Sequence, residues 1–343
     1  SMFLSDGPHG VRKQLGEGDH LGLNASQPST CFPTAAGIAN SWDPELGEAV
    51  GAAMGEEAAA QGVSVLLGPG LNIKRSPLCG RNFEYFSEDP YLAGKMAAAY
   101  VRGIQKNGIA ACPKHFAVNS QELRRMASDS IVDERTLREI YLTGFEMVVK
   151  EAQPKTIMSA YNLVNGTYAN ENAHLLIDIL RRDWGFDGAV VTDWGGSNDH
   201  ALGVKNGSTL EMPAPGGDAI RELMKAVQTG KITEADVDAR VEELLELVFD
   251  HQGGGGRRTR QVRCRRPPRT GTPGCCPEHR AAEERKRPAA PCKGGKGGGH
   301  RRLCPDAPLS GCRLQRRQLH QGGFLLGLPC RERPEQRRLR QGL

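Results

Sequence analysis

The sequence of residues 1–250 predicts an α/β fold, a parallel (β/α)8-type (TIM-like) barrel, followed by a disordered basic tail over residues 251–343. Short apolar segments alternate with amphipathic helices over the first 250 residues, which is the pattern of a parallel sheet covered by helices. The length of this part suits one barrel domain. Charge and residue usage change abruptly near residue 250, which marks the boundary.

Six segments are predicted as strands because each is short, largely apolar and followed by Gly, Pro, Tyr or a charged residue. They are residues 2–4, 63–67, 109–112, 156–160, 189–192 and 208–212. The chain opens within the first of these segments, so we expect a barrel that lacks its N-terminal segment.

Amphipathic helices are predicted over residues 45–61 and 134–151 and from Thr233 onward. Asp133 is placed to cap the second helix, and Asp236 lies three residues after Thr233, as in a capping box. Helical spacing places several apolar residues of the last helix on one face. They are Val237, Val241, Leu244, Leu245 and Val248.

Residues 251–343 cannot form a core, because they contain no Ile, Tyr, Trp, Met or Asn and only one Val and one Phe. They carry 23 Lys and Arg against 6 Asp and Glu, whereas residues 1–250 carry 22 against 34. The positive charge suits a nucleic-acid-binding arm, but no aromatic residues lie among the arginines to stack on bases. The Cys and His spacings of the tail match no structural zinc site.

A third interpretation of the tail is a GC-rich gene translated in the wrong frame, which yields Arg, Gly, Pro, Ala and Cys in excess. Codons can be chosen for residues 286–308 so that translation from one nucleotide later gives a different, meaningful sequence. That sequence has a helix-like segment followed by Ile-Gly-Asp-Phe, which is typical of a strand. We therefore interpret residues 251–343 as an out-of-frame segment that replaces the linker and the start of a second α/β domain. The nucleotide sequence of the gene, read in all three frames, tests this hypothesis.

Polar side chains follow the predicted strands at their carboxyl ends, where the active sites of parallel barrels lie. They are Asp6, Lys114, His115, Tyr161, Asn162, Asp193 and Trp194, with Arg81 and Arg125 in loops after two of the segments. Asp193, directly after Val190-Val191-Thr192, is a candidate nucleophile or base, although an Asp there also suits a helix N-cap. Together these side chains offer donors, carboxylates and an aromatic surface, which suit a polyhydroxylated ring.

Several motifs of the first 250 residues occur in this order in one known family. They are Ser5-Asp6-Gly7-Pro8-His9-Gly10, Gly80-Arg81-Asn82-Phe83-Glu84, Ser87-Glu88-Asp89-Pro90, Lys114-His115-Phe116, Asn119-Ser120-Gln121-Glu122 before Arg125-Met126, Asp193-Trp194 and Leu210-Glu211-Met212-Pro213. With them, residues 1–250 resemble the barrel domain of glycoside hydrolase family 3, and in detail its β-glucosidases. The resemblance implies a retaining double displacement with Asp193 as the nucleophile. It also implies a set of residues that line the site for the non-reducing sugar: Asp6, Arg81, Lys114, His115, Arg125, Tyr161 and Trp194.

Each implied site residue has a role that fits its chemistry. Lys114 and Arg125 would help to keep Asp193 ionised while they bind sugar hydroxyls. Asp6 would accept hydrogen bonds from vicinal hydroxyls, Arg81 and His115 would donate to others, and Trp194 would offer a face to the apolar side of the ring.

Structural roles remain open beside these. Asp6 also suits the cap of a turn, and Lys114 with His115 also suits a buried structural pair. Tyr161 also suits a structural role, and Glu84 fits a buried salt-bridge network as well as sugar contact. Glu88 and Asp89 before Pro90 favour the start of a helix.

N-acetylglucosaminidases of the same family carry a Gly-rich loop with His and Asp after the Lys-His motif. Here Phe116 is followed by Ala117-Val118-Asn119-Ser120, so the resemblance favours a β-glucosidase acting on non-reducing terminal β-D-glucosyl residues. In those enzymes the general acid/base is a Glu of a second domain, and no readable second domain follows residue 250. The sequence therefore predicts an incomplete enzyme that hydrolyses unactivated glucosides negligibly.

The competing hypothesis is an inactive protein that binds sugar, or binds nucleic acid through a genuine basic tail. No cofactor or metal motif occurs, and no apolar run is long enough to span a membrane. The expected partner is a β-glucoside or oligosaccharide; nucleic acid is disfavoured, and the sequence does not indicate an oligomeric state. Only Cys31, Cys79 and Cys112 lie in residues 1–250, which favours a reducing, cytoplasmic compartment.

Overall fold

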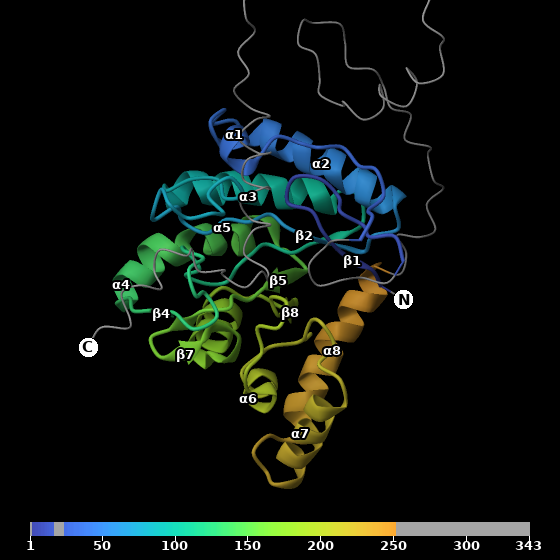
Figure 1. Ribbon diagram of the computed structural model, residues 1–343, viewed down its shortest axis with the longest axis vertical. Coiled ribbons are helices and arrows are strands. Elements are labelled where there is room, and N and C mark those ends of the chain that lie inside the picture. The colour runs from blue at the N-terminus through green and yellow to red at the C-terminus, as the bar shows by residue number, and fades with distance from the viewer. Residues whose placement is uncertain (1, 17–23, 252–343) are drawn as a thin grey trace, which may run out of the picture. The chain divides into compact units, whose positions relative to one another are not determined.

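The computed structural model describes residues 2–16 and 24–251 (Figure 1). The predicted tail, apart from His251, lies outside the described residues, and so does the hypothesis of a shifted reading frame.

Five short parallel strands form the framework, and they follow one another in chain order. They are β1 (Leu4–Asp6), β2 (Val65–Leu67), β3 (Ala110–Ala111), β5 (Thr156–Met158) and β8 (Ala189–Val191). β2 pairs with β1 and β3, and β5 pairs with β8. A parallel bridge between Phe116 and Ser159 joins the segment after β3 to the segment after β5. The α/β prediction is confirmed, and five of the six predicted strand positions hold strands.

The described strands do not close into a barrel. The sixth predicted strand, residues 208–212, contributes only a bridge from Leu210 to Val191. Within residues 2–16 and 24–251, no ladder joins this segment to β1. Met212 is held instead by the Thr192 side chain, which accepts from its N–H at 2.8 Å and donates to its carbonyl at 3.2 Å. The prediction of a (β/α)8 barrel therefore holds here only as a parallel α/β arrangement.

Helices cover the strands and connect them. They are α1 (Ala35–Ala39), α2 (Pro44–Ala60), α3 (Pro90–Gln105), α4 (Glu134–Thr136), α5 (Thr143–Ala152), α6 (His200–Lys205), α7 (Gly217–Gln228) and α8 (Glu234–His251), with the π-helical stretches η1 (Leu137–Leu142) and η3 (His174–Asp183) and the 3-10 turn η2 (Ala169–Glu171). Figure 1 shows α2, α3 and α5 side by side. Of these helices, α2 and α8 match predicted segments closely.

Side-chain caps explain where the predicted helices begin. Asp89 accepts hydrogen bonds from the N–H groups at the start of α3, which confirms the helix start predicted before Pro90. Asp133 caps α4 through the N–H of Thr136, as expected. Thr233 and Asp236 exchange reciprocal hydrogen bonds, so the predicted capping box is confirmed.

The helix predicted over residues 134–151 is divided into α4, η1 and α5, which corrects the prediction of one regular helix. The Thr143 hydroxyl donates to the carbonyl oxygens of both Arg138 and Glu139, at 2.9 and 2.8 Å. A hydroxyl that occupies carbonyl groups of the preceding turn competes with the regular ladder, which favours the wider π-helical turn.

A small second sheet was not predicted. It consists of β4 (Asp129–Ser130), β6 (Leu163–Val164) and β7 (Thr167–Tyr168), with β6 and β7 antiparallel. Asn165 and Gly166 connect β6 to β7, and both have positive φ, of 50° and 86°. An Asn-Gly pair between two short apolar segments is the usual signal for such a hairpin, so the sequence did contain it.

The strands are apolar on both faces because they separate two clusters of side chains. Val65 and Leu67 of β2 belong to an inner cluster together with Val191 of β8. Leu66, between them, belongs to an outer cluster against the helices. Leu247 of α8 packs on the inner cluster, whereas Val241 and Leu245, predicted on the apolar face of that helix, are about half exposed.

Glycines allow α2 and α3 to approach until their backbones touch. A Cβ added at Gly103 of α3 would lie 2.2 Å from the carbonyl oxygen of Glu48, and one at Gly51 of α2 would lie 2.4 Å from that of Tyr100. Backbone atoms at such distances cannot move aside as a side chain can. The close contact of the two helices therefore depends on these glycines.

Replacement of Gly103 by Ala is expected to lower the free energy of unfolding by about 2 kcal/mol, because overpacking outweighs the better helix propensity of Ala. Chemical unfolding of the full chain measures the change. Gly37→Ala in α1 is the matched control, since its Cβ would meet only the Thr34 side chain at 3.5 Å. Equal stabilities of the two variants would contradict the account of the α2–α3 contact.

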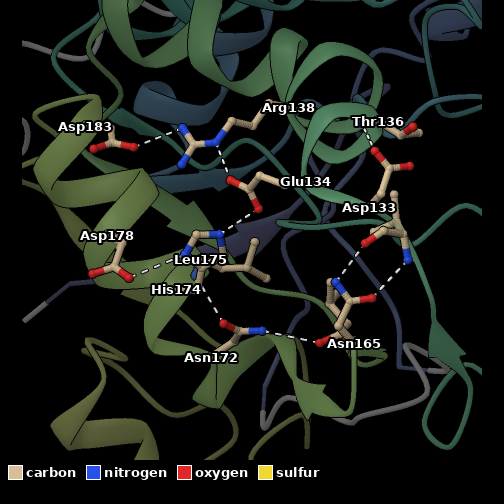
Figure 2. Close-up of polar contacts among 12 residues, drawn as sticks. Asp133, Glu134, Thr136, Arg138, Asn165, Asn172, His174, Leu175, Asp178 and Asp183 are labelled. Carbon is tan, nitrogen blue, oxygen red and sulfur yellow. Dashed lines mark hydrogen bonds and ion pairs between the residues drawn. The ribbon is translucent and has the colours of Figure 1, made fainter.

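Polar contacts on the surface join α4 and η1 to η3 (Figure 2). His174 lies 2.9 Å from Glu134 and 3.4 Å from Asp178, and Arg138 donates to Asp183 at 2.9 Å. The amide of Asn165 exchanges two hydrogen bonds with the backbone of Val132. These groups are largely exposed, so they orient α4, η1 and η3 relative to one another more than they stabilise the fold.

Candidate active site

One cavity of about 560 Å³ lies at the carboxyl ends of the strands, and all eight residues predicted for the site line it. They are Asp6, Arg81, Lys114, His115, Arg125, Tyr161, Asp193 and Trp194. Six of them end a strand or follow one, and the two arginines come from loops. The apolar part of the cavity wall includes Met158, Met212 and Pro213.

Asp193 has one carboxylate oxygen held and the other without a hydrogen bond. Oδ1 accepts from the backbone N–H of Trp194 at 2.8 Å. Among the described residues Oδ2 has no hydrogen-bond partner, and His115 Nε2 lies 3.6 Å from it. Burial raises the pKa of Asp193, and the charge of Lys114 opposes this only in part. The side chain is thus an oriented carboxyl with an oxygen available for chemistry.

Lys114 is buried and lies between two carboxylates. Its Nζ is 2.8 Å from Asp6 Oδ1 and 3.6 Å from Glu84 Oε1. Burial alone would lower the pKa of Lys114, but attraction to Asp6 and Glu84 outweighs it and the pKa is raised. Lys114 therefore carries its charge into the cavity wall.

Asp6 is the carboxylate that remains accessible, with its side chain 51% exposed. Desolvation would raise its pKa, yet the ammonium of Lys114 holds the pKa of Asp6 below its usual value. The group is ionised at neutral pH and can accept hydrogen bonds from a ligand.

Glu84 was left out of the predicted site, but it supports two members of the predicted set. Its two oxygens accept from Arg81 Nε and Nη2 at 2.8 and 2.9 Å, a bidentate pair, and Glu84 also faces Lys114. Glu84 itself is buried. It holds two cations in place without lining the cavity itself, so the salt-bridge interpretation of this residue fits the geometry.

Arg125, Tyr161 and Trp194 form a second group of contacting residues in the cavity wall. The Arg125 guanidinium lies over the Tyr161 ring, 4.4 Å from its centroid, and Glu122 binds Arg125 at 2.6 Å. The Tyr161 hydroxyl donates to the carbonyl of Trp194 at 2.7 Å. That hydrogen bond fixes the backbone next to Asp193, so Tyr161 has a structural partner in addition to its place in the cavity wall.

His115 is held in its place by residues that the sequence did not indicate. Its backbone N–H donates to Asn72 Oδ1 and its carbonyl accepts from Asn72 Nδ2, each at 2.8 Å. The hydroxyl of Tyr85 lies 3.4 Å from its Nδ1. Asn72 and Tyr85 lie 43 and 30 residues from His115 along the chain, so no local spacing could have revealed them.

The described residues contain no group of three or more His, Cys, Asp or Glu that could hold a metal ion. In the same part of the chain, no helix is both long and apolar enough to cross a bilayer. The cavity instead combines the cations Arg81, Lys114 and Arg125 with the carboxylates of Asp6 and Asp193. The cavity wall therefore offers both hydrogen-bond donors and hydrogen-bond acceptors.

The sequence profile of the glycosyl hydrolase family 3 N-terminal domain matches residues 18–247. The chain belongs to glycosyl hydrolase family 3. The family resemblance drawn from the strand-end motifs is thereby confirmed.

Relatives within family 3 match the same part of the chain. The thermostable beta-glucosidase B of Acetivibrio thermocellus is 54% identical over 249 residues, which cover 73% of this chain and 33% of that protein. The exo-alpha-(1->6)-L-arabinopyranosidase of Bifidobacterium longum is 49% identical over 252 residues, 72% of this chain and 33% of that protein. The chain thus spans about a third of the length of these curated relatives.

A solved family 3 structure has the same fold over this part. Beta-glucosidase 3B from Thermotoga neapolitana, in complex with glucose, superposes with a TM-score of 0.69 at 45% sequence identity. The match covers 73% of this chain and 36% of that one.

Proposed function

We propose that this chain carries the nucleophile and the sugar-binding residues of a retaining β-glycosidase of the β-glucosidase type. Asp193 would attack the anomeric carbon of a non-reducing terminal β-D-glucosyl residue and form a glycosyl-enzyme intermediate, which water then hydrolyses. One observation carries this proposal most directly. Asp193 is a buried, oriented carboxyl with one oxygen free of hydrogen bonds, and it faces a cavity rich in donors and acceptors.

The other cavity residues would bind the sugar. Asp6 is accessible and ionised, so it suits a pair of adjacent hydroxyls. Lys114, Arg81 and Arg125 would donate to hydroxyl oxygens, and the charge of Lys114 favours the ionised form of Asp193. His115 would donate from Nε2, and Trp194 with Tyr161 would pack on the ring. The two relatives are named for different sugars, and for this chain we propose glucose.

A retaining glycosidase also needs an acid/base residue that protonates the leaving group. Among the described residues, Glu84 and Glu122 are each bound to an arginine, and Asp6 is bound to Lys114. None of the three is free to protonate a leaving group, so we assign the acid/base role to no residue of this part. The glutamates of the tail, Glu278, Glu283, Glu284, Glu332 and Glu335, lie outside the described residues. If no acid/base residue acts on the leaving group, we expect turnover of unactivated glucosides to be slower by about two to four orders of magnitude.

Mechanism-based trapping tests the proposed nucleophile without an acid/base residue. 2,4-Dinitrophenyl 2-deoxy-2-fluoro-β-glucoside has a leaving group that needs no proton, and its fluorine slows hydrolysis of the intermediate. Intact mass spectrometry of the full chain should show one added fluoroglucosyl group, and peptide mapping should place it on Asp193. A folded chain that remains unlabelled would overturn the proposal.

The rate of labelling should depend on pH through Asp193. The attacking carboxylate must be ionised, and burial raises the pKa of this group above that of an ordinary aspartate. As the pH falls, labelling should therefore decline at a higher pH than an exposed aspartate would require. Labelling rates measured across a pH series, on chain that stays folded throughout, check this. If the labelling rate fell only near the pKa of an ordinary aspartate, the expected effect of burial would be contradicted.

The alternative is an inactive sugar-binding or nucleic-acid-binding protein, for which the positive charge of residues 251–343 is the specific observation. Binding to RNA that weakens steeply with salt, and is lost when residues 251–343 are removed, would favour it. The cytoplasmic location stays a prediction.

A further inference from the structure

His115 presents its two ring nitrogens to two different groups. Nδ1 lies 3.4 Å from the hydroxyl oxygen of Tyr85, and Nε2 lies 3.6 Å from Oδ2 of Asp193. The rings of Tyr85 and His115 meet edge to face, with their centroids 6.3 Å apart. Tyr85 is fully buried and His115 is 1% exposed. Solvent therefore offers neither group a substitute partner.

The imidazole and the phenol are both neutral in this environment. Burial, together with the positive charges of Arg81 and Lys114, lowers the pKa of His115 well below its usual value. A neutral imidazole carries one proton, on either Nδ1 or Nε2. Burial raises the pKa of Tyr85 well above its usual value, so its hydroxyl keeps its proton and needs an acceptor.

The two tautomers of His115 differ in how they satisfy these neighbours. With the proton on Nε2, Nδ1 accepts from the Tyr85 hydroxyl and Nε2–H points to Asp193. With the proton on Nδ1, Nδ1–H faces the Tyr85 hydroxyl oxygen at 3.4 Å, so the hydroxyl proton has to turn away from His115, and the Nε2 lone pair faces a carboxylate oxygen at 3.6 Å. Among the described residues, the Tyr85 hydroxyl has no hydrogen-bond partner other than His115. The tautomer with the proton on Nδ1 would therefore leave the buried Tyr85 donor unsatisfied.

We propose that Tyr85 is a positioning residue: its hydroxyl donates to Nδ1 of His115 and thereby fixes the tautomer that carries the proton on Nε2, facing Asp193 and the cavity. The clamp of Asn72 on the His115 backbone keeps the ring where the Tyr85 hydroxyl can reach it. The Nε2–H group of His115 is thus an uncharged hydrogen-bond donor of fixed direction in a cavity whose other donors include the cations Arg81, Lys114 and Arg125. In the proposed function, that donor serves a sugar hydroxyl or Asp193 Oδ2.

Nuclear magnetic resonance of the full chain labelled with ¹⁵N-histidine tests the tautomer directly. The two ring nitrogens of a neutral histidine have well-separated shifts, and the pattern of couplings to the ring protons tells which nitrogen is protonated. His115→Gln identifies the resonances of His115. We expect His115 to be almost entirely Nε2–H in the unchanged protein. A spectrum of the Nδ1–H form would overturn the proposal.

Tyr85→Phe removes the hydroxyl and keeps the ring. We expect the Nδ1 shift of His115 to move toward that of a mixture of tautomers in this variant. Tyr100→Phe is the matched control, because Tyr100 is also buried, its hydroxyl has no hydrogen-bond partner in the described part of the chain, and it packs on Phe86. The control should leave the His115 resonances unchanged. Equal spectra for Tyr85→Phe and the unchanged protein would also overturn the proposal.

Asp193→Ala separates the influence of Tyr85 on the His115 tautomer from that of the Asp193 carboxylate. It also tests the proposal if Tyr85→Phe does not fold. If Tyr85 sets the tautomer, His115 stays Nε2–H when Asp193 is removed. A shift to the Nδ1–H form or to a mixture would assign the effect to Asp193 and overturn the proposal.

The role of the donor in sugar binding rests on the proposed function, but the tautomer does not. Tyr85→Phe should raise the Kd for glucose about tenfold, the scale of one hydrogen bond. If glucose does not bind at all and the Nε2–H form is still observed, the proposed function fails while the assignment to Tyr85 stands. If glucose binds equally well to Tyr85→Phe and to Tyr100→Phe, the positioning role is refuted.

Discussion

Replacement of Asp193 by Asn is expected to abolish covalent labelling by the 2-fluoro glucoside. Asparagine has the same shape, and its side-chain oxygen can still accept from the N–H of Trp194, so the loop should keep its conformation. The amide cannot act as a nucleophile at the anomeric carbon. Labelling should become at least about a thousandfold slower, as is typical when a catalytic nucleophile is removed. Intact mass spectrometry over a time course measures the change.

The matched control is Asp133→Asn. Asp133 caps α4 from the surface, and asparagine caps helices about as well as aspartate. This variant should be labelled at the rate of the unchanged chain. Labelling of Asp193→Asn at a comparable rate would show that another residue is the nucleophile, and peptide mapping would identify it.

Replacement of Glu84 by Gln is expected to lower the free energy of unfolding by about 3 kcal/mol, the scale for removal of one partner of a buried ion pair. Glu84 neutralises Arg81 through two hydrogen bonds and lies 3.6 Å from Lys114. Glutamine keeps the volume but leaves the guanidinium without its countercharge. Lys114 would keep only Asp6 as its partner. Unfolding of the full chain by urea measures the loss.

Glu139→Gln provides the comparison for Glu84→Gln. Glu139 of η1 pairs with Arg135 of α4, one turn earlier, and both side chains are exposed to solvent. Such pairs contribute little to stability, so this variant should unfold like the unchanged chain. Equal losses from the two variants would show that the Glu84 network is screened by water and does not support the cavity.

The sequence predicted the site better than it predicted the closure of the sheet. Each site residue lies at the end of a short apolar run or in a family motif, so its place depends on local order along the chain. All eight predicted residues line one cavity. Their roles toward a sugar remain predictions.

Features that depend on particular side-chain hydrogen bonds could not be predicted in the same way. The Thr143 hydroxyl takes two carbonyl groups and widens one turn, but a threonine in a helical pattern does not by itself indicate this. Residues 208–212 have the composition of a strand, yet side-chain hydrogen bonds from Thr192 fix their end. Asn72 and Tyr85 are ordinary in composition, and only the fold brings them to His115.

The position of Lys114 between Asp6 and Glu84 has a consequence for how the cavity would receive a ligand. Glu84 holds the ammonium from its buried side, so a hydroxyl group could bind the accessible Asp6 without displacing Lys114. The local field is then preorganised, and little free energy is lost to rearrangement when a ligand enters. Because charges within a protein are screened less than charges in solution, sugar affinity should change little with ionic strength.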